Sequence, residues 1–285
     1  MSKRYVLPIL IPLHYGANVE GIQYGADYVL ENLEDYILLP EIIIKDKRND
    51  QNLKNIHSVL ATNGVLATTV SYIYKNGQFP LVIGGDHSVA LGSISAVALQ
   101  EDNLGVIWID AHGDMNTNVT SESGNIHGMI LASLVGEGDP KMINLYREKI
   151  KLKKENVVIF GVRDLDVGEQ EIIEKLNIKY LSYAYIRQIG IKQALDEVRA
   201  YFIGKIEKLH VSIDLDSLDP NIMPGVSIPV ENGFKKDDVR IIVDYLFTNF
   251  TISSADIVEY NPLFDSKDKT LNFLLELIEK IKSLV

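Results

Sequence analysis

The sequence predicts a three-layer α/β protein in which helices cover both faces of a mainly parallel central sheet. Short apolar segments rich in β-branched residues alternate with longer helical patterns along all 285 residues, and this alternation is typical of βαβ units. Runs such as LGVIWID at 104–110 and NVVIFGV at 156–162 are continuously apolar, which indicates strands buried on both faces. Because no linker or internal repeat divides the chain, we expect one domain over residues 1–285.

Eight segments have the length and composition of strands, and six have that of helices. We predict strands at residues 5–11, 37–44, 79–84, 105–110, 156–162, 179–182, 209–214 and 253–258. We predict helices at residues 50–75, 89–99, 168–176, 191–203, 236–247 and 269–284.

The first strand begins in MSKRYVLPILIPLHYG, which also has the basic start and apolar run of a signal peptide. Two prolines, His14 and the lack of a small-residue cleavage site favour a buried strand. No other apolar stretch approaches the length that spans a bilayer. We therefore expect a cytoplasmic protein.

Composition narrows the possible partners and ligands. The net charge of −11 argues against nucleic acid or an anionic membrane as a partner. The chain has no cysteine, which excludes disulfides, thiolate metal ligands and cysteine nucleophiles. Any metal must therefore be held by imidazole and carboxylate groups.

In a parallel sheet, ligands bind outside the carboxyl ends of the strands, so the residues that follow each strand are the ones to examine. The predicted strand at 79–84 runs into GGDHS, where Gly84–Gly85 permits a tight turn. Asp86 and His87 then precede a helix that begins near Ser88. Taken alone, this segment favours the alternative that Asp86 or Ser88 only caps the helix.

The strand at 105–110 leads into DAHGDMN. Asp110, His112 and Asp114 fall at i, i+2 and i+4, so an extended backbone would point all three to one face. Converging carboxylates destabilise a fold unless a positive charge lies between them. A solvated loop that carries this pattern by chance is the alternative.

The strand at 209–214 leads into DLDSLDP. Asp214 and Asp216 share a face at i, i+2, and two such carboxylates raise each other's pKa unless a cation intervenes. Asp219–Pro220 has the composition of a turn, in which the aspartate is structural.

These junctions together supply two histidines and four aspartates. This ligand set suits Mn²⁺ better than a lone structural Zn²⁺, and four carboxylates can bridge two ions about 3.5 Å apart that share and activate one water. Hydrolysis is therefore the expected reaction class. The six candidate metal ligands are His87, Asp110, His112, Asp114, Asp214 and Asp216.

The segments GGDHS at 84–88, DAHGDMN at 110–116 and SIDLDSLDP at 212–220 together resemble the arginase/agmatinase/formiminoglutamase (ureohydrolase) family. The resemblance implies a three-layer α/β fold with a binuclear Mn²⁺ site at the carboxyl ends of the strands. It assigns the same six ligands and implies attack of a metal-bridging hydroxide on a guanidinium carbon. It also implies a homo-trimer or homo-hexamer.

Within the family, residues 114–129 are most similar to the arginase loop that holds the amino-acid end of the substrate. By this resemblance, Asn116 and Ser123 bind the α-carboxylate and Asn125 shapes the loop. His127 shuttles protons to the leaving amine, and Asp114 acts in catalysis as well as in metal binding. A turn at 123–125 and a structural histidine are the alternatives.

Two further segments extend the resemblance to arginase. GVRDLDVGE at 161–169 implies that Asp166 contacts the α-amino group, and EYNP at 259–262 implies that Glu259 pairs with the guanidinium during catalysis. A local salt bridge between Arg163 and Asp164, and a solvated Glu259, are the alternatives. Their joint occurrence with the six ligands favours the functional interpretation.

One segment departs from the arginase pattern. Arginases carry Gly-Thr-Pro where this chain has Ser227–Ile228–Pro229, and PGVS-x-P at 224–229 is similar to formiminoglutamases. The leading hypothesis is a Mn²⁺-dependent arginase that makes L-ornithine and urea from L-arginine. The alternatives are a formiminoglutamase or other guanidino-compound hydrolase, and a metal-binding protein with impaired catalysis.

Overall fold

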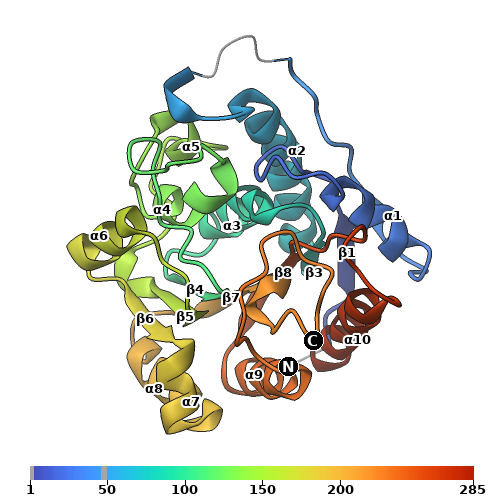
Figure 1. Ribbon diagram of the computed structural model, residues 1–285, viewed down its shortest axis with the longest axis vertical. Helices are drawn as coiled ribbons and strands as arrows, with labels where there is room; N and C mark the ends of the chain where they lie inside the picture. Colours follow the sequence, from blue (N-terminus) through green and yellow to red (C-terminus); the bar gives the residue numbers. More distant parts are fainter. Residues whose placement is uncertain (1–2, 46–49) are drawn as a thin grey trace.

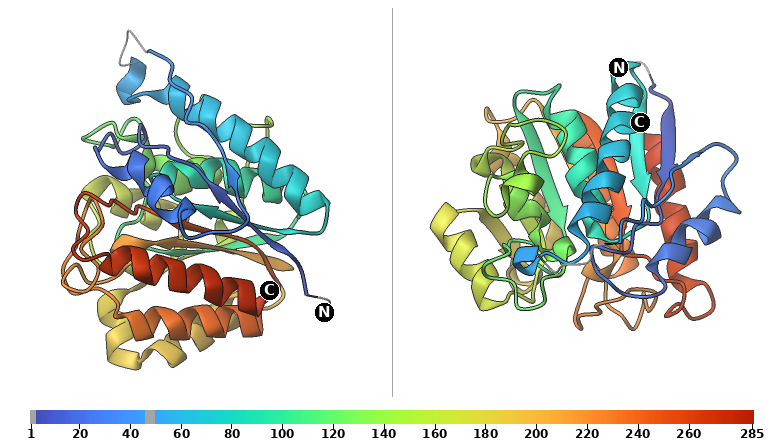
Figure 2. Two further views of the ribbon diagram at one scale, coloured as in Figure 1. Left: turned by 90° about the vertical axis from the view of Figure 1, so that its right-hand side faces the viewer. Right: turned by 90° about the horizontal axis from the view of Figure 1, so that it is seen from above.

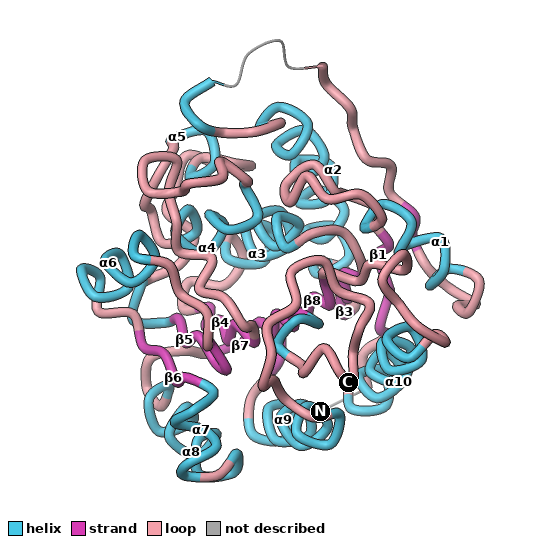
Figure 3. Tube along the Cα trace, in the orientation of Figure 1, coloured by secondary structure: helices cyan, strands magenta, loops and turns pink. Residues whose placement is uncertain are grey.

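The computed structural model describes residues 3–45 and 50–285 of the chain. Its centre is one eight-stranded sheet in the order β2-β1-β3-β8-β7-β4-β5-β6, and every neighbouring pair of strands is parallel. Figure 3 shows these strands, in magenta, surrounded by helices. The strands are β1 (Val6–Leu10), β2 (Ile37–Leu38), β3 (Phe79–Ile83), β4 (Leu104–Ile109), β5 (Val157–Val162), β6 (Lys179–Ser182), β7 (Lys208–Asp214) and β8 (Ile252–Val258).

Helices cover both faces of this sheet (Figures 1 and 2). Residues on one face pack against α2 (Ile56–Lys75), α3 (Ala90–Ala98), α4 (Ile130–Leu134), α5 (Pro140–Ile143) and α6 (Val167–Leu176). Residues on the other pack against α1 (Gly25–Leu30), α7 (Tyr183–Ile189), α8 (Ile191–Phe202), α9 (Lys236–Asn249) and α10 (Lys269–Leu284). This arrangement confirms the predicted three-layer α/β fold.

The central strands are apolar on both faces because each face meets a helical layer. On β4, Val106 and Trp108 belong to one core, whereas Ile107 and Ile109 belong to the other. All four side chains are fully buried. The continuous apolar runs in the sequence therefore reflect the burial of these strands on both faces of the sheet.

The predicted strand at 37–44 is shorter than expected, because only Ile37–Leu38 pairs with β1. Beyond it, the main-chain N–H groups of Ile42 and Ile44 donate to the hydroxyls of Thr62 and Ser58 on α2. Apolar, β-branched composition allowed a strand here, but α2 supplies the hydrogen-bond partners that a strand would have found in the sheet.

The helix predicted at 50–75 is in part a different structure. Residues 46–49 are not described, Asp50–Asn52 form a 3₁₀ turn, and α2 begins at Ile56. Helices α1, α4, α5 and α7 were not predicted, since their four to seven residues are too few to show a helical period. Among the described residues, no helix combines the length and apolar character needed to cross a membrane.

Candidate metal centre

The loops that follow β3, β8, β7 and β4 meet at one edge of the sheet, because these four strands are neighbours and parallel. The loop after β3 turns through Gly84 and Gly85, whose φ angles of +86° and +76° favour glycine. Asp86 then caps the 3₁₀ turn His87–Val89 by accepting the N–H of Ser88 at 2.9 Å. The alternative that Asp86 caps the helical turn is thus correct. The same turn directs the side chain of His87 into the interior.

His87 faces three carboxylates. Its Nδ1 atom lies 3.0 Å from Asp110 Oδ2, 3.0 Å from Asp214 Oδ2 and 3.2 Å from Asp114 Oδ2. The other ring nitrogen, Nε2, lies 2.9 Å from the Ser212 hydroxyl. This second contact fixes the ring so that Nδ1 points at the carboxylates.

A second group forms around His112. Its Nδ1 atom lies 3.1 Å from Asp216 Oδ2 and 3.4 Å from Asp110 Oδ1. Asp110 therefore offers one oxygen to each histidine, and both groups have ligand atoms close enough to hold an ion. The structure brings all six predicted ligands together.

The backbone reaches this geometry differently from the prediction. Asp114 has a φ of +50°, so the segment from Asp110 is not extended. Asp214 ends β7, but Asp216 lies in a 3₁₀ turn, Leu215–Ser217. The side chains converge through these turns rather than through strand alternation.

Electrostatics favour a cation at this position. Burial, together with the neighbouring Asp110 and Asp216 carboxylates, raises the pKa of Asp214 well above its usual range. Burial and Asp110 do the same to Asp114. Burial lowers the pKa of His87, but the facing carboxylates outweigh it and raise that pKa to about 9. The carboxylates are thus held at a cost that a divalent cation would offset.

Two buried ring nitrogens, His87 Nδ1 and His112 Nε2, have no hydrogen-bond partner within the described parts of the chain. His87 Nδ1 nevertheless lies among three carboxylate oxygens, as a metal-binding imidazole does. The mixture of carboxylate oxygens and imidazole nitrogens fits Mn²⁺. The residues present therefore fit a pair of divalent ions.

His127 and Glu259 lie beside the two groups. Glu259 follows β8 at a φ of +66° and is 3% exposed, so the solvated-loop alternative is wrong. Its Oε1 accepts the main-chain N–H of His87 at 2.9 Å, and its Oε2 is buried without a partner among the described residues. Burial lowers the pKa of His127, but the contact with Glu259 outweighs it and raises that pKa overall.

A pocket of about 310 Å³ opens above these residues. Asn116, Ser123, Asn125 and Asp166 line it, together with His127 and four of the six candidate ligands. His87, Asp110 and Glu259 are not among the lining residues, and all three are buried.

Two of the residues predicted to bind the amino-acid end of the substrate, Asn116 and Asp166, are hydrogen-bonded to each other. Asn116 Nδ2 donates to Asp166 Oδ2 at 2.6 Å, and Asp166 Oδ1 caps α6 by accepting the N–H of Glu169 at 2.9 Å. Asn125 Oδ1 is buried and has no hydrogen-bond partner within the described chain. The residues that line the pocket thus include an acceptor without a partner.

Several lining residues were not predicted. Glu122, Asp164 and Glu169 bring the carboxylates in the lining to seven, and no Lys or Arg of the described residues lines it. Burial raises the pKa of Glu169 to about 7. These residues lie inside the segments that carry the resemblance, but no spacing rule singles them out.

Two more unpredicted residues support His87. Trp108 stacks on its ring at 3.8 Å between centroids, and Ser212 contacts its Nε2. Each stands two positions before a ligand, Asp110 or Asp214, on a strand whose side chains alternate. That alternation is the signal that could have found them.

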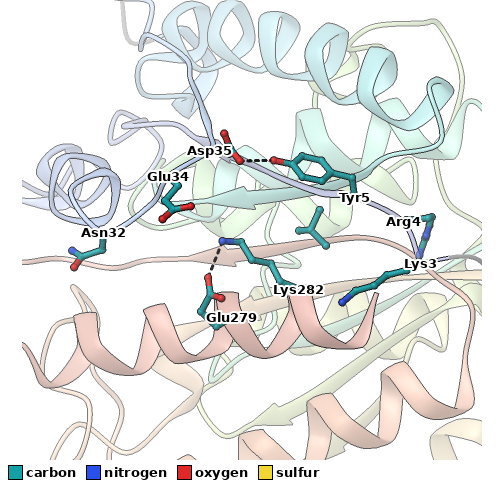
Figure 4. Close-up of a pocket in the computed structure, with 9 residues that line it drawn as sticks. Lys3, Arg4, Tyr5, Asn32, Glu34, Asp35, Glu279 and Lys282 are labelled. Carbon is teal, nitrogen blue, oxygen red and sulfur yellow. Dashed lines mark hydrogen bonds and ion pairs between the residues drawn. The ribbon is translucent and has the colours of Figure 1, made fainter.

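A larger cavity, of about 700 Å³, lies near the start of β1 and the end of α10 (Figure 4), away from the carboxyl ends of the strands. Here Tyr5 donates to Asp35 and Lys282 donates to Glu279. None of the predicted site residues lines it. Size alone therefore does not mark the functional site, whereas the converging ligands do.

Known proteins share both sequence and structure with this chain. A model of the Arginase family matches residues 11–282. The arginase of Bacillus subtilis (strain 168) is 43% identical over 254 residues, which cover 89% of this chain and 84% of that protein. The solved structure of arginase from Bacillus caldovelox has a TM-score of 0.91 and 36% identity, and the alignment covers 99% of this chain and 98% of that one. The chain belongs to the arginase family.

Proposed function

We propose that the protein is a Mn²⁺-dependent arginase that hydrolyses L-arginine to L-ornithine and urea. The observation that carries this proposal is the pair of histidine–carboxylate groups that share Asp110, next to a pocket lined by the predicted head-group residues. Relatives about 40% identical over most of the chain are arginases.

We assign His87, Asp110, Asp114 and Asp214 to one metal ion, and Asp110, His112 and Asp216 to the other. These assignments rest on the distances among the six side chains. Two bound divalent ions would lower the pKa of a shared water and so supply a nucleophile at neutral pH.

The chain's own residues hold the substrate against this centre. Glu259 would accept a guanidinium N–H through its Oε2, which is buried and has no hydrogen-bond partner among the described residues. Ser123 and Asn116 offer donors to the α-carboxylate, Asp166 offers an acceptor to the α-ammonium, and Asn125 shapes the loop. An imidazole ordinarily exchanges a proton near physiological pH, so the side chain of His127 is chemically suited to deliver a proton to the leaving amine.

A substrate panel tests this function. Protein loaded with Mn²⁺ is assayed with L-arginine, agmatine, guanidinobutyrate and formiminoglutamate. Agmatine lacks the carboxylate that Asn116 and Ser123 would bind, so kcat/KM for L-arginine should exceed that for agmatine by at least about 10²-fold. Metal-dependent urea release from arginine is the expected result. Metal-loaded protein that turns over none of the four would support the catalytically impaired alternative.

One observation favours the second candidate, a formiminoglutamase. Ile228 lines the pocket and is 37% exposed, in the position where the resemblance to arginase calls for a threonine. Hydrolysis of formiminoglutamate by protein that is inert with arginine would establish this candidate instead. The cytoplasmic location, the single domain and the trimeric or hexameric assembly remain predictions from the sequence and the resemblance.

A further inference from the structure

Arg163 lies on the loop between β5 and α6, and its side chain forms five hydrogen bonds, all to main-chain carbonyls. The distances are 3.1 Å from Nε to Glu231, 3.1 Å from Nη1 to Ser217, and 2.8, 3.3 and 2.8 Å from Nη2 to Asp216, Leu218 and Val230. Its guanidinium forms no ion pair with the described carboxylates, so the alternative of a salt bridge to Asp164 is wrong. Because all of these hydrogen bonds go to main-chain carbonyls, the side chain of Arg163 holds the backbone of residues 216–218 and 230–231 in place.

The carbonyls belong to two segments that both bear on the site. Residues 216–218 include the candidate ligand Asp216 and the end of its 3₁₀ turn. Residues 230–231 follow shortly after Ile228, which lines the pocket. The side chain of Arg163 thus joins the loop that carries Asp216 to the segment that follows Ile228.

The main chain of Arg163 is fixed as well. Its N–H donates to Ala111 O at 2.8 Å, and the N–H of Asp164 donates to the same oxygen at 3.0 Å. Ala111 stands between the ligands Asp110 and His112. The residue therefore connects the loop that carries His112 with the loop that carries Asp216.

We infer that Arg163 is a positioning residue that sets the separation of His112 and Asp216. It thereby sets the affinity of the metal position formed by Asp110, His112 and Asp216. This inference rests on the proposed binuclear function. Metal ligands must lie within about 0.2 Å of their preferred distances, and groups that orient ligands from outside typically change metal affinity 10–100-fold. Loss of the clamp would free the 216–218 carbonyls, and with them the side chain of Asp216.

Only arginine has the required shape. Its planar guanidinium presents donors in a rigid fork that reaches two segments at once, whereas the ammonium of lysine is a compact point with three donors. Arg163→Lys keeps the positive charge near Asp216 but removes the fork. Comparing it with Arg163→Met therefore separates charge from positioning.

The test is a Mn²⁺ titration of metal-free protein, followed by the electron paramagnetic resonance signals of single and coupled ions, with the Tm of the metal-free protein alongside. We expect both variants to bind one Mn²⁺ as the wild type does, and to bind the other, at the position of His112 and Asp216, about 10–100-fold more weakly. Arg187→Lys is the matched control, since Arg187 is half-exposed and 3.9 Å from Asp238 on α9, away from the pocket. It should bind both ions normally.

Three outcomes would overturn the inference. The first is that both variants match the wild type at both positions. The second is that Arg163→Lys alone matches it, which would make charge the cause. The third is that both ions bind more weakly in proportion to a lowered Tm of metal-free protein, which would make the effect general destabilisation. Wild-type protein that binds no Mn²⁺ would instead overturn the proposed function itself.

A measurement on the wild type decides the matter if the variants do not fold. Hydrogen exchange is compared among metal-free protein and protein with one and with two Mn²⁺ ions. Residues 216–218 and 230–231 should gain protection in the same binding step, because Arg163 links them. Protection of 216–218 alone would overturn the inference.

Discussion

The Nδ1 atom of His127 lies 3.2 Å from Oε1 of Glu259. The same oxygen accepts the main-chain N–H of His87, so one carboxylate oxygen joins the candidate proton shuttle to a candidate metal ligand. The other oxygen of Glu259 is buried and has no hydrogen-bond partner among the described residues. Because His127 and His87 contact this carboxylate separately, His127 can be replaced without removing a candidate metal ligand.

Replacement of His127 by asparagine should lower kcat by roughly 10²–10⁴-fold, the usual contribution of a positioned acid–base group. Metal content should stay at the wild-type level, because His127 belongs to neither histidine–carboxylate group. The measurements are steady-state turnover and bound Mn²⁺ per chain. His14→Gln is the control, since His14 pairs with Glu41 and does not line the pocket. A variant that loses its metal would show that His127 is a ligand or a structural residue.

Removal of metal should destabilise the protein, since buried Asp110, Asp114 and Asp214 would face one another without a cation. A ligand at about 100 times its Kd stabilises the state that binds it by about 2.7 kcal/mol. Chelation should therefore lower the Tm, and added Mn²⁺ should restore it.

Asp114→Ala should lose bound metal and activity together, whereas Asp102→Ala, at an exposed turn, should lose neither. A Tm that does not respond to Mn²⁺ in the wild type would contradict this account.

Ile228→Thr should raise the turnover of L-arginine, because it restores a hydroxyl to the pocket wall beside the expected guanidinium position. The measurement is kcat/KM for arginine in the variant and the wild type. Ile241→Thr, on the exposed face of α9, is the matched substitution away from the pocket and should change nothing. Equal or lower activity in Ile228→Thr would mean that Ile228 is not what limits arginine turnover.

Gly161→Ala should destabilise the fold by about 1–3 kcal/mol, the usual effect of overpacking. Gly161 has a φ of +102°, and an added Cβ would lie 2.4 Å from the Phe234 ring. Gly64→Ala in the middle of α2 is the matched control, because its Cβ would meet nothing within 4 Å. That change should stabilise by roughly 0.5–1 kcal/mol. Denaturant unfolding measures both, and equal effects would contradict the steric argument.

The strands that are buried on both faces could be predicted from the sequence. Because helices cover each side of them, every position is apolar or small, as in β4 and β5. The prediction overextended the edge strand β2, which pairs with β1 only at Ile37–Leu38; beyond it, Ile42 and Ile44 bond to side chains of α2 rather than to a strand. No local pattern tells a segment which partner will receive its hydrogen bonds.

The convergence of the six candidate ligands could be predicted because each follows a buried strand or lies in the turn after it. Their geometry could not, since Asp114 and Asp216 reach the centre through turns rather than extended backbone. The role of Arg163 was also hidden, because its acceptors are main-chain carbonyls at 216–218 and 230–231. Carbonyls carry no residue identity, so such contacts leave little trace in a sequence.

The parallel sheet has a consequence for the newly made chain. Glu259 follows His87 by 172 positions, and ribosomes add about 5–20 residues per second, so roughly 10–30 s separate the synthesis of the two. The strands β7 and β8, which lie between β3 and β4 in the sheet, are made only late in this interval. The ion-binding centre is therefore closed by the last third of the chain, and a ribosome stalled before β7 should carry a nascent chain that cannot retain Mn²⁺.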